Sequence, residues 1–220
     1  MEIPCCSFIS NSLLLFFFYL VFTSLRGVYR YCLRKGKDLK ARYSQGNETY
    51  ACVTGATSGI GKGFAFELAS RGFNVLLVSR SESKLKAVQE ELKSKYPGLL
   101  FDYVVSDFGE NQSLQFYEDI CAKINKFDIG LLVNNAGIMH IGRFNDIEAQ
   151  QHLQVMEVNM LPYTMVTRYI LPKMMNRNAR SGIVMVSSLG IQASCAPVNA
   201  IYMATKAFDD SFARGLAYEV

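Results

Sequence analysis

Tyr202 and Lys206 are the pair of residues in this sequence whose types and spacing most directly suggest chemistry. Residues four apart are neighbours on one face of a helix, so this spacing places a phenol beside an ammonium group. An ammonium group favours the phenolate form of a neighbouring tyrosine, whose ordinary pKa is about 10, and so brings proton exchange nearer to neutral pH. The same spacing is typical of an ordinary solvated pair. A cofactor site elsewhere in the chain would favour the acid–base interpretation.

A strand, a glycine-rich turn and a helix are predicted in that order over residues 50–72. In dinucleotide-binding proteins the three glycines of such a turn give a tight bend, close approach of the backbone to a phosphate, and close packing of helix on strand. The helix N-terminus then offers free N–H groups to a pyrophosphate. A plain turn is the alternative, but the strand and helix around the glycines favour nucleotide binding. The residues expected to contact the cofactor here are Thr54, Gly55, Thr57, Ser58, Gly59, Ile60 and Gly61.

The end of the second predicted strand, Asn74–Ser79, indicates which nicotinamide cofactor binds. An acidic residue at this point holds the ribose 2′-hydroxyl of NAD, whereas an arginine accommodates the 2′-phosphate of NADP. The chain has Ser79 and Arg80 here and no acid. We therefore expect NADP(H), with Arg80 pairing with the phosphate and Ser79 hydrogen-bonding it. A surface position without a ligand is the alternative for Arg80.

Strands and helices continue to alternate along the middle of the chain. Further strands are predicted at 99–105, 130–133 and 182–188, and amphipathic helices at 81–95 and 114–124. Short links between such elements indicate an α/β fold with a Rossmann-type doubly wound parallel sheet. Ligands bind such a sheet at the carboxyl ends of its strands.

Polar residues follow the third and fourth predicted strands. Asp107 can bond the adenine amino group or cap the next helix. The run Asn134-Asn135-Ala136-Gly137 can bond diverging strands through its amides, and its glycine allows an unusual turn. We expect Asn134, Ala136 and Gly137 to form part of the cofactor shelf and its scaffold rather than to do chemistry.

Two further polar positions lie where chemistry is expected. Asn159 stands inside a long apolar helix, three residues before Pro162, which invites a local kink. It is either a functional residue or a buried structural asparagine. Ser187 and Ser188 end the fifth predicted strand on the ligand side, and because a strand alternates its faces only one of them can point at a substrate.

The N-terminal residues predict a membrane anchor. Residues 8–25 are uncharged, and 13 of these 18 residues are apolar or aromatic. At a helical rise of about 1.5 Å per residue the run spans roughly 27 Å, close to the thickness of an endoplasmic reticulum bilayer. Seven basic residues within 26–42 predict that the following domain faces the cytosol. A cleaved signal peptide, which needs a basic n-region that this chain lacks, and an interfacial segment are the alternatives.

Charge and cysteine usage exclude other classes of function. Residues 43–220 hold 16 basic and 17 acidic residues, so no basic face suggests a nucleic-acid partner. The six cysteines are scattered and the chain has two histidines, so we expect reduced thiols and no metal site. With 220 residues the chain suits one full domain. We place the anchor at 1–25, a basic cytoplasmic linker at 26–48 and an NAD(P)-binding domain at 49–220.

Five motifs in this order resemble the short-chain dehydrogenase/reductase family over residues 50–220. They are T-G-x-x-x-G-x-G from Thr54, N-N-A-G from Asn134, Asn159, Ser188 and Y-x-x-x-K from Tyr202. The anchor, its basic flank and Val78-Ser79-Arg80 resemble the membrane-anchored branch of that family, which contains very-long-chain 3-oxoacyl-CoA reductases and 17β-hydroxysteroid dehydrogenase type 12. Ser188 stands 14 residues before Tyr202, one more than the commonest family spacing, so Ser187 stays an alternative to it.

The resemblance implies roles for four residues. Tyr202 gives a proton to the substrate carbonyl oxygen, and Ser188 orients that carbonyl. Lys206 activates the tyrosine and bonds the nicotinamide ribose, and Asn159 holds a water in a proton relay. These roles agree with the acid–base chemistry expected from the residues themselves.

The resemblance also implies an NADPH-dependent reductase of a lipid-like ketone at the cytosolic face of the endoplasmic reticulum. A long-chain 3-oxoacyl-CoA is favoured over a 17-ketosteroid. The alternatives are a catalytically silent cofactor-binding or scaffolding fragment and a luminal steroid reductase. Family members continue beyond the Y-x-x-x-K helix, so we expect the domain to be incomplete after Val220. The apolar stripes at 156–174 and 208–216 serve either as a homodimer surface or as core.

Overall fold

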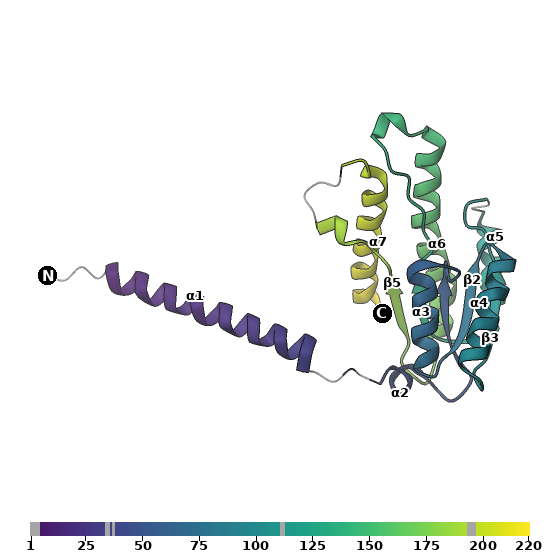
Figure 1. Cartoon of the computed structure of the whole chain (residues 1–220), viewed down its shortest axis with the longest axis horizontal. Coiled ribbons are helices and arrows are strands. Elements are labelled where there is room, and N and C mark those ends of the chain that lie inside the picture. The colour runs from purple at the N-terminus through teal and green to yellow at the C-terminus, as the bar shows by residue number, and fades with distance from the viewer. Residues whose placement is uncertain (1–4, 34–35, 37, 111–112, 193–196) are drawn as a thin grey trace. The chain divides into compact units, whose positions relative to one another are not determined.

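The computed structural model describes residues 5–33, 36, 38–110, 113–192 and 197–220. The chain divides into two compact units, one within residues 1–37 and the other from Asp38 to Val220. The second unit carries the whole sheet and is drawn with its helices in Figure 1. The predicted candidate site lies within this second unit.

A five-stranded parallel sheet organises the second unit, with strand order β3-β2-β1-β4-β5. The strands are β1 Thr49–Thr54, β2 Asn74–Ser79, β3 Phe101–Val105, β4 Asp128–Asn134 and β5 Gly182–Met185. The order reverses direction between β1 and β4, which makes the carboxyl ends of these two strands the switch point where ligands bind such sheets. The predicted α/β Rossmann-type sheet is confirmed.

Helices cover both faces of the sheet. They are α3 Gly59–Ser70, α4 Glu82–Lys95, α5 Leu114–Ile124, α6 Ala149–Met175 and α7 Ala200–Glu219. One apolar core joins the sheet to α5 and α6, and the other joins it to α3 and α4. Neighbouring strand residues alternate between the two cores, so Leu76 lies in the first and Leu77 in the second. α6 continues through Pro162 and Pro172, and α7 packs on α6 (Figure 1).

β5 lies at an edge of the sheet and, among the described residues, pairs only with β4. A groove of about 450 Å³ lies beside it, between the C-terminal turns of α6 and α7. Leu171, Met174, Ile183 and Leu216 are among the residues that line the groove. One side of this short strand is therefore bordered by an apolar hollow rather than by another strand.

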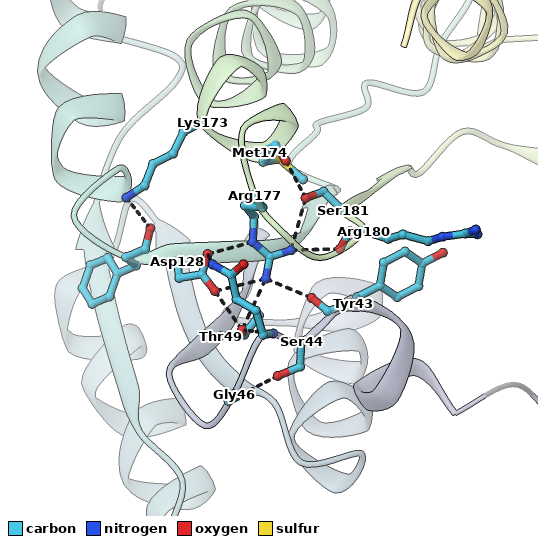
Figure 2. A network of polar contacts seen from close by, with 12 residues as sticks. Tyr43, Ser44, Gly46, Thr49, Asp128, Lys173, Met174, Arg177, Arg180 and Ser181 are labelled. Atoms are coloured by element: carbon cyan, nitrogen blue, oxygen red, sulfur yellow. Dashed lines mark hydrogen bonds and ion pairs between the residues drawn. The ribbon is translucent and has the colours of Figure 1, made fainter.

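Arg177 follows the C-terminal end of α6 and forms hydrogen bonds with several chain segments at the amino ends of the strands (Figure 2). Its side chain is 3% exposed, and its Nε and Nη2 donate to the two carboxylate oxygens of Asp128 at 2.7 and 3.0 Å. Nη2 also donates to the carbonyl of Tyr43, the last residue of α2 (Leu39–Tyr43), at 3.0 Å. Thr49 at the start of β1 donates to the same carboxylate at 2.8 Å. The network therefore fixes α2 and two strand starts to one another, at the end of the sheet opposite the predicted site.

In the first unit, α1 runs from Cys5 to Val28 and continues as a π-helical stretch, Tyr29–Leu33. The apolar and aromatic side chains from Leu13 to Phe22 are exposed, because no other part of the described chain covers them. Among the residues that the structure describes, none of the helices combines the length and the apolar character needed to cross a membrane. The transmembrane span predicted within residues 1–25 is therefore not supported by the structure.

Candidate active site

The glycine-rich turn forms between β1 and α3, as the sequence predicts. Gly55 and Gly59 have positive φ angles of 65° and 54°, which side chains rarely tolerate. A Cβ atom added at Gly61 would overlap the carbonyl oxygen of Gly55 and the amide nitrogen of Asn135. The absence of side chains therefore lets this turn pack directly on the loop that follows β4.

Thr54 joins the two loops at the switch point. Its hydroxyl oxygen accepts hydrogen bonds from the backbone N–H groups of Asn135 at 2.9 Å and Ala136 at 3.1 Å. The Asn135 side chain in turn donates to the Thr54 carbonyl at 2.9 Å. Asn134 donates to Thr167 of α6 at 2.9 Å. These contacts agree with the predicted scaffold function of the N-N-A-G run.

A cleft of about 370 Å³ opens at the carboxyl ends of the first four strands. The predicted cofactor residues that line it are Gly55, Thr57, Ser58, Ile60, Ser79, Arg80, Asp107, Ala136 and Gly137. Thr54, Gly59, Gly61 and Asn134 do not line it. Ser58 precedes α3 without a side-chain capping bond, so its side chain leaves the N–H groups of the first turn to another acceptor.

The β2 side of the cleft is positively charged. Arg80 lines it together with Lys84 of α4, which is not among the residues predicted from the sequence. Lys84 lies in the first turn of α4, four residues after Arg80, and its position close to the end of β2 was the available signal. The hydroxyl groups of Thr57 and Ser79 lie 3.1 Å apart on the same wall. The set suits a phosphate group, because two cationic residues and two hydroxyl residues line the same cleft.

Asp107 does not cap α5. The N-cap of that helix is Ser113, whose hydroxyl accepts from the N–H of Phe116 at 3.2 Å. Asp107 instead accepts from the N–H of Gly109 at 2.9 Å while it lines the cleft. The capping alternative is wrong, and Asp107 stays available to the cleft.

Asn159 is fully buried and crosslinks three elements. Its Oδ1 accepts from the N–H of Ile138 at 2.8 Å, and its Nδ2 donates to the Ile138 carbonyl and to Thr205 of α7, each at 3.0 Å. Both N–H groups of the amide therefore have protein acceptors. Asn159 holds α6, the loop after β4 and α7 together.

Lys206 is buried as well, with 4% of its surface exposed. Its Nζ donates to the Tyr163 hydroxyl at 3.2 Å, to the Val186 carbonyl at 3.0 Å and to Asp209 Oδ2 at 2.9 Å. The Tyr202 ring centroid lies 6.0 Å from the same Nζ. Because the ammonium is enclosed by protein, the interpretation of Tyr202 and Lys206 as an ordinary solvated pair is wrong.

Tyr163 and Asp209 complete this cluster, and neither is among the residues predicted from the sequence. Burial raises the pKa of Asp209 to about 6, although the charge and hydrogen bond of Lys206 act in the opposite direction. Burial, and then the charge of Asp209, raise the pKa of Tyr163. The signal for Asp209 was its spacing of three residues from Lys206, which places both on one helical face.

The two serines after β5 have different partners. The Ser187 hydroxyl donates to the backbone carbonyl of Lys206 at 2.7 Å. The Ser188 hydroxyl oxygen accepts from the N–H of Gly190 at 3.2 Å, an arrangement that leaves its own proton for another acceptor. This geometry favours Ser188 as the residue that can bond a carbonyl oxygen.

The predicted catalytic residues lie beside the cofactor cleft and are not part of its lining. Tyr202 lines a second cavity of about 10 Å³ with His140, His152 and Asn199. Lys206 lies against the cleft wall, because a Cβ atom added at Gly137 would lie 3.7 Å from its Nζ. The structure therefore brings Asn159, Lys206 and the cleft wall together around Gly137.

A family model described as short chain dehydrogenase matches residues 49–220, which is more than half of the chain. The chain belongs to the short-chain dehydrogenase family. This membership confirms the resemblance found in the sequence, and members of the family are oxidoreductases. The closer resemblance to 3-oxoacyl-CoA reductases also agrees with the relatives described next.

The chain is similar to several curated proteins. It is 37% identical over 194 residues to a very-long-chain 3-oxoacyl-CoA reductase of Caenorhabditis elegans, covering 86% of this chain and 58% of that protein. It is 37% identical over 184 residues to the protein of that name from Anas platyrhynchos, covering 82% and 57%. It is 36% identical to hydroxysteroid dehydrogenase-like protein 1 of Gallus gallus, covering 83% and 53%. The chain thus spans little more than half the length of these relatives.

Solved structures share the fold. An NADPH-bound short-chain oxidoreductase from Pseudomonas aeruginosa superposes with a TM-score of 0.70 at 25% identity, over 79% of this chain and 66% of that one. A short-chain dehydrogenase from Sphingobium yanoikuyae in complex with NADPH gives a TM-score of 0.69 at 29% identity, over 78% and 65%. A nicotinamide cofactor is therefore the ligand class that this fold accommodates.

Proposed function

We propose that this chain carries the cofactor-binding part of an NADP(H)-dependent oxidoreductase that reduces a ketone on a lipid-like substrate. The observation that supports this most directly is the cleft at the switch point, with the glycine turn at one end and Arg80 and Lys84 at the other. A long-chain 3-oxoacyl-CoA is the favoured substrate, and a 17-ketosteroid is the second choice. Relatives named for both classes of substrate support this order.

The residues of the cleft fit NADP(H). Gly59 has no side chain, so the backbone of the turn can approach a pyrophosphate closely, and the packing at Gly61 holds this turn against the loop after β4. Arg80, Lys84 and Ser79 can bind a 2′-phosphate, and β2 ends without the acid that would bind a 2′-hydroxyl. Asp107 can accept a hydrogen bond from the adenine amino group.

Bound NADPH supplies a hydride for the carbonyl carbon of the substrate. Tyr202 donates one proton to the carbonyl oxygen, and the Ser188 hydroxyl donates a hydrogen bond to the same oxygen, so the negative charge that develops there is stabilised by donors already in place. Lys206 would hold the nicotinamide ribose with its ammonium group, in exchange for one of its three present hydrogen bonds. Asn159 holds α7 against the loop after β4 through its side-chain hydrogen bonds. In the proposed relay, its Oδ1 accepts a hydrogen bond from a water molecule.

Cofactor preference tests the first part of this proposal. We expect the full chain to bind NADPH at least tenfold more tightly than NADH, as measured by the change in dinucleotide fluorescence. Arg80→Gln is expected to abolish most of that preference by weakening NADPH binding alone, because one charge-assisted phosphate contact corresponds to roughly tenfold in affinity. Tighter binding of NADH by the wild-type protein would exclude NADP(H) as the preferred cofactor.

Turnover tests the second part. NADPH oxidation with a short 3-oxoacyl-CoA is compared for the wild type and Tyr202→Phe, which removes only the proton donor. We expect loss of turnover with unchanged NADPH affinity in the variant. Equal turnover in the two proteins would show that Tyr202 is not the donor.

A catalytically silent cofactor-binding protein is the second candidate. One observation favours this candidate: the Lys206 ammonium already donates three hydrogen bonds to protein acceptors. NADPH binding without turnover of any 3-oxoacyl-CoA or ketosteroid would support this candidate over the reductase.

The location at the cytosolic face of the endoplasmic reticulum and the pairing of two copies stay predictions. Exposed apolar side chains along α1 and the basic residues that follow it are consistent with contact to a lipid surface. Carbonate extraction of membranes and protease protection in sealed microsomes test the location. Protection of the catalytic domain would indicate a luminal enzyme instead.

A further inference from the structure

Asp209 is an acidic residue of α7 that is completely buried. Its side chain is 0% exposed, and it lies near enough to Tyr163 of α6 for its charge to act on that phenol. Its Oδ2 accepts from Lys206 at 2.9 Å, while its Oδ1 is buried without a hydrogen-bond partner among the described residues. A buried carboxylate with one unpaired oxygen is costly, and an apolar pair of similar volume often packs at least as well.

The bonds of Lys206 differ in strength. The bond to Asp209 is charge-assisted, and such bonds are about twice as strong as neutral ones. The bond to the Tyr163 hydroxyl is the longest of the three, at 3.2 Å, and its acceptor is neutral. A new acceptor in the cleft will therefore replace Tyr163 before it replaces Asp209.

The ammonium group also lies against the wall of the cofactor cleft. A Cβ atom added at Gly137 would be 3.7 Å from Nζ, and Gly137 lines the cleft. Asp209 lies one helical turn further along α7, and its carboxylate accepts a hydrogen bond from the same ammonium. The carboxylate of Asp209 therefore holds the Lys206 ammonium from the protein interior, and Gly137 is the cleft residue that lies against this ammonium.

We propose that Asp209 is a positioning residue that keeps the Lys206 ammonium at the cleft wall, and that the bond to Tyr163 is the one exchanged when a cofactor ribose binds. The second half of this proposal rests on the proposed function, and the first half does not. Among the described residues, the other titratable groups that face the cluster are Tyr163 on α6 and Tyr202 on α7. From the segment after β5, Val186 contributes a carbonyl.

The first experiment needs no cofactor. The rate of reductive methylation of Lys206 is measured by mass spectrometry in the wild type, in Asp209→Asn and in Asp210→Asn. Asp210 is the matched control, since it is the next residue and pairs with Arg214 with 38% of its side chain exposed. We expect labelling of Lys206 to be at least fivefold faster in Asp209→Asn and within twofold of the wild type in Asp210→Asn. Equal rates in all three proteins would overturn the proposal.

A folded state is checked in the same samples, because a loosened variant would also expose Lys206. Cys121 is 1% exposed and serves as the reporter, since its thiol must stay unreactive if the core is intact. If Asp209→Asn exposes Cys121, the wild type provides the decisive measurement. Its affinity for NADH is then expected to fall about tenfold between pH 7.5 and pH 5, as Asp209 becomes neutral, and an unchanged affinity would overturn the proposal.

The second experiment tests the link to the cofactor. The affinity for NADPH is expected to be about tenfold lower in Asp209→Asn than in the wild type at pH 7.5 and nearly equal to it at pH 5. The comparison between the two proteins cancels the titration of the 2′-phosphate, whose second pKa is about 6. A merely structural contribution of Asp209 would give the same ratio at both pH values. Failure of every protein to bind NADPH, with the labelling difference intact, would contradict the proposed function and leave the positioning of Lys206 supported.

Discussion

Replacement of Arg177 by methionine is expected to destabilise the second unit by about 3 kcal/mol without altering the cofactor cleft. The guanidinium is 3% exposed and binds both oxygens of Asp128. Removal of one partner from a buried ion pair costs about 3–5 kcal/mol, because the remaining charge is left uncompensated. Asp128 keeps 22% of its side chain exposed, so water compensates part of this cost and the lower end applies.

The assay is urea unfolding followed by far-ultraviolet circular dichroism, with thermal unfolding as a second measure. For a domain of this size, about 3 kcal/mol corresponds to a decrease of roughly 6–12 °C in Tm. Arg177→Lys is expected to recover only part of the loss, since an ammonium cannot form the two-pronged contact. Arg180→Met is the control, because Arg180 is exposed and contributes only its backbone carbonyl to the network.

The pH dependence gives an independent check. Burial alone would raise the pKa of Asp128, but the hydrogen bonds of Arg177 and Thr49 and the charge of Arg177 lower it below the ordinary 3.8. A carboxyl group with a lowered folded pKa contributes stability above its unfolded pKa, and this contribution is lost as the pH falls through the folded value. The difference in free energy of unfolding between the wild type and Arg177→Met should therefore become smaller below about pH 4. If Arg177→Met lowers the free energy of unfolding by less than about 1 kcal/mol at neutral pH, or if its difference from the wild type does not depend on pH, the proposed contribution of this ion pair is refuted.

Three further predictions concern single side chains. Gly61→Ala is expected to weaken NADPH binding at least tenfold by fluorescence titration, because the new methyl group overlaps the glycine turn; unchanged affinity would contradict the packing described. Ser188→Ala should lower turnover roughly a hundredfold, whereas Ser187→Ala should cost about 1 kcal/mol of stability and keep most of the activity; the reverse pattern would assign the carbonyl contact to Ser187. Burial raises the pKa of Cys121 to about 12, so its alkylation should be far slower than that of the exposed Cys32, as followed by mass spectrometry.

The order of strands and helices and the place of the cofactor cleft were predictable from the sequence. Continuous apolar runs such as Asn74–Ser79 are typical of strands buried on both faces, and glycines at the turn after β1 mark where a ligand approaches. Both signals are local, because each depends on residues within about ten positions of one another.

The surroundings of Lys206 were less predictable, because they depend on how α6, α7 and the segment after β5 pack together. The motif containing Lys206 gave no indication that its ammonium would be bonded to Tyr163, 43 residues earlier in the chain. The contact between Lys206 and Asp209 could be predicted from their spacing, but an acidic residue three positions after a lysine more often forms an ion pair on the protein surface. Only its complete burial distinguishes it.

The edge position of β5 has a consequence for handling the protein. Four residues with backbone donors and acceptors on one side, next to an apolar groove, form a template that another strand can join. Copies of the chain at high concentration can meet through this edge and grow into assemblies that scatter light. Measurements of affinity and stability on this chain should therefore be repeated over a range of protein concentrations, so that self-association is separated from ligand binding and unfolding.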